Sequence, residues 1–271
     1  MPTLLLVAAD SVRSLLHQRL LLGLMLASLA VTAIFSTLLI KERAARRQQF
    51  TAEAVANSPT GAAKLSKEDQ QKLAEQMGQM ASIFEAGFYQ VASFGGSLVA
   101  LFIFSTAVAT EIRRGTIRIT MTKPVSRSQY LLGKYLGGVA VMAGYALISG
   151  AAIALFGKFG GVQLSPAIKY APWLMFCRQL MLGSLAMLLS LYLHPFLGAV
   201  LAFLAGNGLY SPHDPLFYIF PSYSVFNVFG QVLQGTLLNG KDIVLLTLYA
   251  GDFVIVMLLL ALWRFRTKEI V

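Results

Sequence analysis

The charged residues that could do chemistry in this chain are concentrated in one stretch, from Glu111 to Lys134, between two long runs without charge. Most of its charged side chains are basic, and Glu111 is its only acid. Gly133-Lys134 is followed by Tyr135 and lacks the earlier glycine of a P-loop, so it cannot cradle a nucleotide phosphate. Lys and Arg accumulate on the cytoplasmic side of membrane spans, so a basic segment between apolar runs indicates a cytoplasmic loop.

The histidines and the search for nucleophile motifs indicate neither a metal site nor a catalytic site elsewhere in the sequence. His17, His194 and His213 are far apart in the sequence and fall on both predicted sides of the membrane, which argues against a three-His metal site. His213-Asp214 could form a catalytic pair, but the flanking prolines favour a plain outer turn. No G-x-S-x-G motif occurs. We therefore expect no catalytic residues, metal or cofactor in this chain.

Two charged residues fall inside predicted spans. Arg178 lies about two turns into the span at 173–192, and Asp252 lies near the middle of the span at 243–263. Ionisable groups in a bilayer are costly and are usually paired or functional. One expectation is a structural Arg178–Asp252 ion pair. The alternative is that Arg178 snorkels outward and Asp252 faces a wet cavity.

The composition indicates that membrane helices position these residues. Of the 271 residues, 56% are hydrophobic and 13% are charged, whereas soluble domains carry about 25% charged residues. The net charge of +10 does not require a nucleic acid partner, because basic residues beside spans face anionic lipid. Cys177 is the only cysteine, so the chain can form no internal disulfide. We predict an all-α polytopic membrane protein with one transmembrane domain over residues 1–271.

Apolar runs predict six spans with an interfacial helix before them. The predicted elements are an interfacial helix at 3–19, span one at 20–40, an outer loop at 41–83, span two at 84–110, a basic loop at 111–134, span three at 135–157, span four at 173–192, span five at 196–209, an outer interfacial or re-entrant element at 217–234, and span six at 243–263. Residues 3–19 have amphipathic spacing, although they could also be the first turns of span one. Span five is short for a full crossing.

Two further predictions concern the outer loop and the side of the membrane on which the termini lie. A turn at 57–61 and a helix start at Ser66 predict two short helices in the outer loop, which either cap the outer side or only connect spans. Six spans put both termini on one side. Lys and Arg divide almost evenly between the two sides, but the loops other than 41–83 favour cytoplasmic termini.

The basic loop carries local start and stop signals. Gly115 permits a close turn beside Glu111, and Pro124 cannot continue a helix. Ser126 and Gln129 have the spacing of a capping box, so we expect a new helix to start near Arg127. Val125 and Tyr130 occupy the positions of a hydrophobic staple around that start.

This loop resembles that of ABC type-2 permeases, the membrane subunits of a class of ABC exporters. The resemblance lies in Glu111 at the end of a span, Gly115-Thr116, Pro124-Val125-Ser126-Arg127 and Gly133-Lys134. It implies a coupling helix at about 114–122 that sits in a groove of a separate ATPase, with Glu111 at its hinge. The residues assigned to ATPase coupling are Glu111, Arg113, Arg114, Gly115, Thr116, Ile117, Arg118, Ile119, Met121, Pro124 and Arg127.

The resemblance also implies partners and a location. ATP and Mg would be bound by the partner ATPase, a second copy of this chain or a homologous permease would complete the transporter, and the bacterial cytoplasmic membrane would hold it. Two other functions stay open. One is a membrane-embedded, lipid-modifying enzyme with His213 and Asp214 at the outer interface, and the other is an assembly subunit without transport. An ATPase gene beside this one would favour the transporter, whose substrate the residues do not indicate.

Overall fold

The computed structural model describes residues 2–16, 67–115, 126–159, 169–206, 223–227 and 238–267, with isolated positions between 18 and 41. All regular elements of these residues are helical, which confirms the predicted all-α class. They are α1 (Pro2–Leu16), α3 (Lys67–Thr106), α4 (Ala109–Arg114), α6 (Arg127–Phe159), α7 (Ala171–Tyr192), α8 (Pro195–Gly206), the 3₁₀ turn η2 (Tyr223–Phe226) and α11 (Gly240–Thr267).

Among the residues that the structure describes, four helices are long and apolar enough to cross a membrane. They are Glu85–Arg113, Arg127–Leu155, Ala171–Tyr192 and Gly240–Thr267, and they overlap predicted spans two, three, four and six. Predicted span one lies outside the described residues, apart from isolated positions. With 12 residues, α8 extends over roughly 18 Å, less than a hydrocarbon core of about 30 Å. A polytopic all-α membrane protein is thus confirmed, while the count of six spans stays a prediction.

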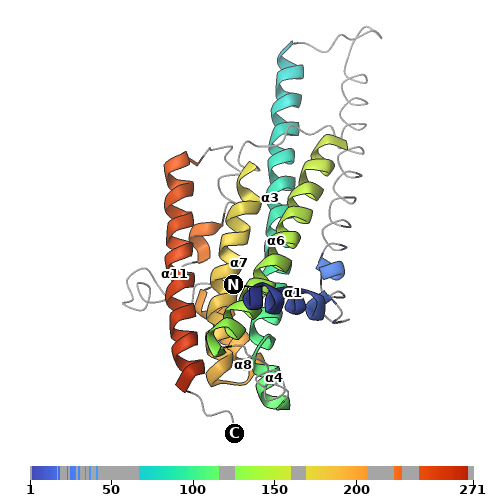
Figure 1. The fold of residues 1–271 in the computed structure, drawn as a ribbon. Coiled ribbons are helices and arrows are strands. Elements are labelled where there is room, and N and C mark those ends of the chain that lie inside the picture. Colours follow the sequence, from blue (N-terminus) through green and yellow to red (C-terminus); the bar gives the residue numbers. More distant parts are fainter. Residues whose placement is uncertain are drawn as a thin grey trace.

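The outer loop does not contain a separate second helix. α3 begins at Lys67, next to the predicted start, and continues without a break for 40 residues into span two. It extends beyond the other labelled helices (Figure 1). Between Lys67 and Phe94 there is no proline, and the only glycines are Gly78 and Gly87. An isolated glycine costs a helix only about 1 kcal/mol, so nothing local ends it. The prediction of a separate short helix there is therefore wrong.

α7 is the central helix of the bundle. It packs against α3, α6, α8 and α11, and most of it is buried, whereas little of α11 is buried. Small residues allow the close approach: the Phe104 ring fills the space beside Gly183 of α7, and a Cβ at Gly138 of α6 would lie 2.6 Å from the same ring. α11 lies at the edge of the bundle, with most of its surface uncovered (Figure 1).

α1 lies across α6 (Figure 1). Gly133 and Gly137 of α6 form the contact surface, where a Cβ at Gly137 would lie 2.6 Å from Ser11 Cβ and 3.1 Å from the Ala8 carbonyl oxygen. The helix ends at Leu16. This crossing does not fit the alternative that α1 is only the first turns of span one. Its place in the membrane interface stays a prediction.

His194 and Pro195 form the predicted tight turn between α7 and α8. The backbone N–H of Phe196 donates to His194 Nδ1 at 3.2 Å, and that of Gly198 donates to the His194 carbonyl oxygen at 2.8 Å. His194 therefore caps α8, and Pro195 occupies the first helical position, where its missing N–H has no consequence. The turn lets α8 pack back against α7, with Gly198 next to the Ser190 backbone.

η2 is the described part of the predicted outer element at 217–234. Tyr223 and Phe226 are buried. The Tyr223 ring lies against Gly206 at the end of α8 and leaves no room for a Cβ there. The Tyr89 hydroxyl of α3 donates to the Phe226 carbonyl oxygen at 3.3 Å. Helices thus cover Tyr223 and Phe226, whereas Val225 is exposed, and the interfacial or re-entrant character of this segment stays a prediction.

Candidate coupling site

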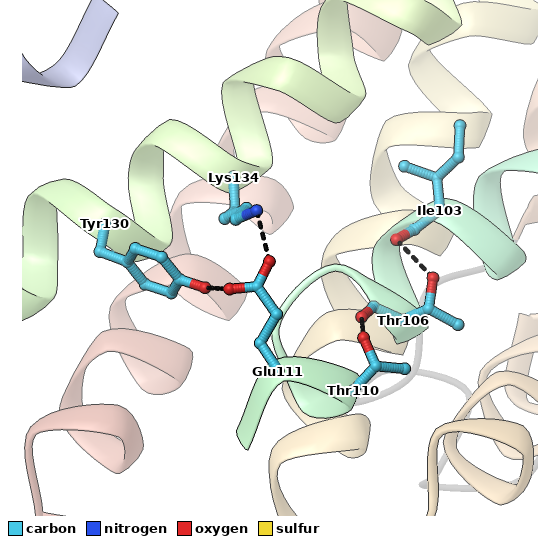
Figure 2. A network of polar contacts seen from close by, with 6 residues as sticks. All are labelled: Ile103, Thr106, Thr110, Glu111, Tyr130 and Lys134. Carbon is cyan, nitrogen blue, oxygen red and sulfur yellow. Dashed lines mark hydrogen bonds and ion pairs between the residues drawn. The ribbon is translucent and has the colours of Figure 1, made fainter. Parts of the chain in front are cut away.

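The site begins where α3 ends. The Thr106 hydroxyl donates to the Phe102 carbonyl oxygen at 2.6 Å, and the Thr110 hydroxyl donates to the Thr106 carbonyl oxygen at 2.6 Å. Such bonds from Thr side chains to the preceding turn bend helices. α3 stops at Thr106, Ala107 and Val108 form a turn, and α4 starts at Ala109. The predicted span 84–110 is therefore a bent, two-part element (Figure 2).

Gly115 ends α4 in the left-handed conformation. Its φ is 71° and its ψ −1°, and its N–H donates to the Ile112 carbonyl oxygen at 3.2 Å. Glycine adopts this conformation without strain, so the predicted close turn is present. The predicted coupling helix does not begin at Arg114, however, because Arg114 is the last residue of α4 and Gly115 breaks the helix after it. Thr116, Ile117, Arg118, Ile119, Met121 and Pro124 lie outside the described residues.

α6 begins at Arg127, as the capping-box spacing predicts. The Ser126 N–H donates to Gln129 Oε1 at 3.1 Å, and the Gln129 N–H donates to Ser126 Oγ at 3.3 Å. Both halves of the capping box are thus formed. The helix start places Tyr130 and Lys134 one turn apart on the same face of α6. Val125 lies outside the described residues, so its packing against Tyr130 stays a prediction.

Glu111 of α4 joins Tyr130 and Lys134 of α6 (Figure 2). Lys134 Nζ lies 2.6 Å from Glu111 Oε1, and the Tyr130 hydroxyl donates to Glu111 Oε2. Lys134 Nζ also lies 5.7 Å from the centroid of the Tyr130 ring. The Lys134 side chain is 10% exposed and that of Glu111 27%, so the ion pair is largely withdrawn from water, where charges interact more strongly. We call these three residues the Glu111 network.

The N-terminal end of α6, which carries Tyr130, also contacts the C-terminal end of α11. The Tyr130 ring stacks on Phe265 with centroids 6.1 Å apart, and Phe265 is fully buried. The Arg127 guanidinium donates to the Arg266 carbonyl oxygen at 3.1 Å, and Arg266 donates to Ser128 Oγ at 2.8 Å. α4, the start of α6 and the end of α11 therefore form one connected unit.

Of the predicted site residues that the structure describes, two lie at the Glu111 network. Glu111 lies in the network and Arg127 beside it, whereas Arg113 is exposed at the end of α4. Tyr130 and Phe265 were not among the predicted coupling residues. Tyr130 could have been found, because its spacing of four from Lys134 places both on one helix face. Phe265 had no such signal, since only the tertiary contact between α6 and α11 brings it to Tyr130.

Arg178 and Asp252 do not form the predicted ion pair. Arg178 is 9% exposed, and its Nη1 donates to Ser93 Oγ of α3 at 3.1 Å. Asp252 is exposed on α11. The prediction fails because Arg178 faces α3, while Asp252 lies on the uncovered surface of α11. The alternative that Arg178 snorkels outward is also wrong, because Arg178 is buried. Whether Asp252 faces a wet cavity stays a prediction.

The family assignment rests on the sequence match. The family described as "ABC-2 family transporter protein" matches residues 7–194, more than half of the 271 residues. The chain belongs to the ABC-2 transporter family. The match begins within α1 and contains the Glu111 network, whereas α11 and Asp252 lie beyond it. No curated protein matches the sequence.

Membership of the ABC-2 family confirms the resemblance found in the basic loop. It identifies the chain as a membrane component of an ABC transporter, a class of subunit that works with ABC ATPase subunits and is generally not catalytic itself. Among the residues that the structure describes, no group of three or more His, Cys, Asp or Glu side chains could hold a metal ion.

Proposed function

We propose that this chain is the permease subunit of an ATP-driven ABC exporter, and that a separate ATPase subunit docks on the basic loop at 111–134. The observation that carries the proposal is the Glu111 network, which fixes the entry of this loop to its exit. Under this proposal the ATPase binds ATP and Mg²⁺, and its conformational change moves the helices of the permease. The absence of a P-loop motif from the sequence agrees with that division.

The geometry suits the transmission of movement from the loop to the spans. A loop with loosely held ends would absorb a push by deforming. Here Glu111 holds the end of α4 to α6, and Tyr130 and Arg127 hold α6 to α11. A push on the loop would therefore rock α6 and α11 together, while the break at Ala107 and Val108 lets α4 move against α3. Rigid-body rocking of this kind is a common way for proteins to switch between states.

We place this end of the bundle on the cytoplasmic side of a bacterial inner membrane, with both termini on that side. In support, Arg113, Arg127, Arg264 and Arg266 flank the ends of three spans next to the Glu111 network. Transport would run outward. The working transporter would contain two permease copies, identical or homologous, and two ATPase subunits.

Co-purification of the ATPase with variants of the loop tests the proposal. Ile117→Asp removes an apolar anchor, and Gly115→Pro removes the N–H that bonds to Ile112 and cannot adopt a φ of 71°. We expect both variants to insert into the membrane but to lose ATPase association or ATP turnover. Ile83→Asp, at a 60% exposed position of α3 outside the loop, is the matched control. Wild-type association and turnover in both loop variants would contradict docking at this loop.

A further inference from the structure

A buried polar cluster lies between α3 and α7, separate from the coupling site. Arg178 Nη1 donates to Ser93 Oγ at 3.1 Å. One turn further along the same face of α3, the Gln179 amide lies so close to Gly96 that a Cβ at Gly96 would overlap it. Arg178 and Gln179 of α7 therefore face the same strip of α3. By helical rise, Ser93 lies on the order of 25 Å from Glu111.

The cluster contains polar groups without partners. Gln179 is completely buried, and neither its Nε2 nor its Oε1 has a hydrogen-bond partner. Tyr223 of η2, which packs against α7 and lies close enough to Arg178 to interact with its charge, is 1% exposed, and its hydroxyl also has no hydrogen-bond partner. A buried polar group without a partner costs about 1–3 kcal/mol. Native proteins leave few such groups unless water, an ion or a ligand satisfies them. The cluster therefore has the properties of an incomplete site.

The charge and the donors of the cluster indicate the class of ligand. An arginine side chain keeps its proton in proteins. Arg178 therefore places a fixed positive charge inside the bundle. A phenol has a pKa of about 10, so Tyr223 is a neutral donor at neutral pH. Tyr89 also faces the cluster, and its hydroxyl already donates to Phe226. Glu85, the buried acid of α3, lies about two turns before Ser93 and makes a contact of its own.

We propose that Arg178, Gln179 and Tyr223 bind a phosphate group of the molecule that this transporter moves. A guanidinium, an amide NH₂ and a phenol are all donors, and a phosphate oxygen accepts from each of them. The inference rests on the proposed transport function and names its substrate class. Binding requires α3 and α7 to part, and the partnerless Gln179 and Tyr223 groups favour that step because parting lets them be satisfied.

Equilibrium binding to the full chain in phosphatidylcholine nanodiscs tests this site without the ATPase. The probes are dodecyl phosphate and inorganic phosphate, which separate a membrane-borne anion from a soluble one, and dodecyltrimethylammonium, which has the opposite charge. We expect saturable binding of at least one phosphate probe and none of the ammonium. Arg178→Gln should weaken phosphate binding by roughly tenfold or more. Arg264→Gln, the same change at the end of α11, should leave it unchanged.

Two milder variants keep the test decisive if Arg178→Gln does not fold. Tyr223→Phe and Gln179→Leu remove the partnerless groups themselves, and we expect each to weaken phosphate binding several-fold. If the cluster serves only packing, both should bind as the wild type does and should be at least as stable. That result would overturn the proposal, as would equal binding of the ammonium probe or the absence of saturable phosphate binding.

The same experiment separates this proposal from the proposed function. Loss of phosphate binding with intact ATPase co-purification would remove the anion site and leave the docking proposal standing. Intact phosphate binding together with wild-type ATPase association in the loop variants would remove the docking proposal and leave the anion site standing.

Discussion

Lys134 Nζ lies 2.6 Å from Glu111 Oε1, and this ion pair joins residues 23 positions apart across the basic loop. The Tyr130 hydroxyl donates a hydrogen bond to the other carboxylate oxygen, Glu111 Oε2. The ends of the loop are thereby closed by charged and hydrogen-bonding groups that are mostly buried. This arrangement would let a docked partner move the helices as well as the loop.

Breaking the ion pair from one side should destabilise the protein more than removing both charges. Glu111→Gln leaves the mostly buried Lys134 ammonium without this counter-charge, and Lys134→Met removes the ammonium that neutralises the Glu111 carboxylate. Breaking a buried pair in this way costs about 3–5 kcal/mol, and the partial exposure of Glu111 reduces that cost. The double variant leaves no orphan charge, so its melting temperature should exceed that of either single variant. Additive losses would show that the two charges do not depend on each other.

Tyr130 should link Glu111 to α11 through two separable parts of its side chain. Tyr130→Phe removes the hydrogen bond to Glu111 and keeps the ring stacked on Phe265, at a cost of about 1–2 kcal/mol. Phe265→Leu keeps the hydrogen bond and weakens the stack. We expect both variants to bind the ATPase while showing reduced substrate-stimulated ATP turnover. Wild-type turnover in both would limit the network to a structural role.

Gly115 should tolerate substitution only by residues that enter the left-handed region. The φ of 71° costs an ordinary L-residue about 1–2 kcal/mol, whereas Asn adopts it more readily. Gly115→Asn should therefore retain ATPase association, and Gly115→Val should lose part of it. The measurement is co-purification of the ATPase at equal permease expression. Equal behaviour of the two variants would show that the backbone conformation does not matter for docking.

Asp252 should act independently of Arg178. A carboxylate in the middle of a lipid-facing span is costly, so we expect a partner surface or a wet cavity to cover it. Asp252→Leu should then reduce assembly or transport, and full stability and activity would show that the charge is incidental. Because Arg178 and Asp252 do not meet, the losses from Arg178→Leu and Asp252→Leu should add. A double variant milder than either single one would imply an ion pair in another state.

The orientation of the membrane domain can be tested by cysteine labelling in a Cys177→Ser background. A membrane-impermeant reagent added from outside should modify a cysteine at Ser58 and should miss one at Thr120. This follows from cytoplasmic termini and six spans, with Ser58 in the outer loop and Thr120 in the basic loop. The reverse labelling pattern would overturn the orientation.

The sequence by itself determined the features that depend on short stretches of chain. Apolar length indicated the helices that contain predicted spans two, three, four and six, because a bilayer requires about 20 apolar residues for a crossing. The spacing of Ser126 and Gln129 placed the start of α6, and His194-Pro195 placed the turn before α8. These signals could be read because each cap forms between residues no more than a few positions apart.

The tertiary structure decided which side chains meet. Spacing could place Arg178 and Asp252 at comparable depths, but only the packing of α7 against α3 showed that Arg178 faces Ser93. The contact of Phe265 with Tyr130 likewise joins residues from opposite halves of the chain. A helix presents residues in every direction around its axis, and the face that is buried depends on its neighbours. In a span that is apolar all round, periodicity carries little information about those neighbours.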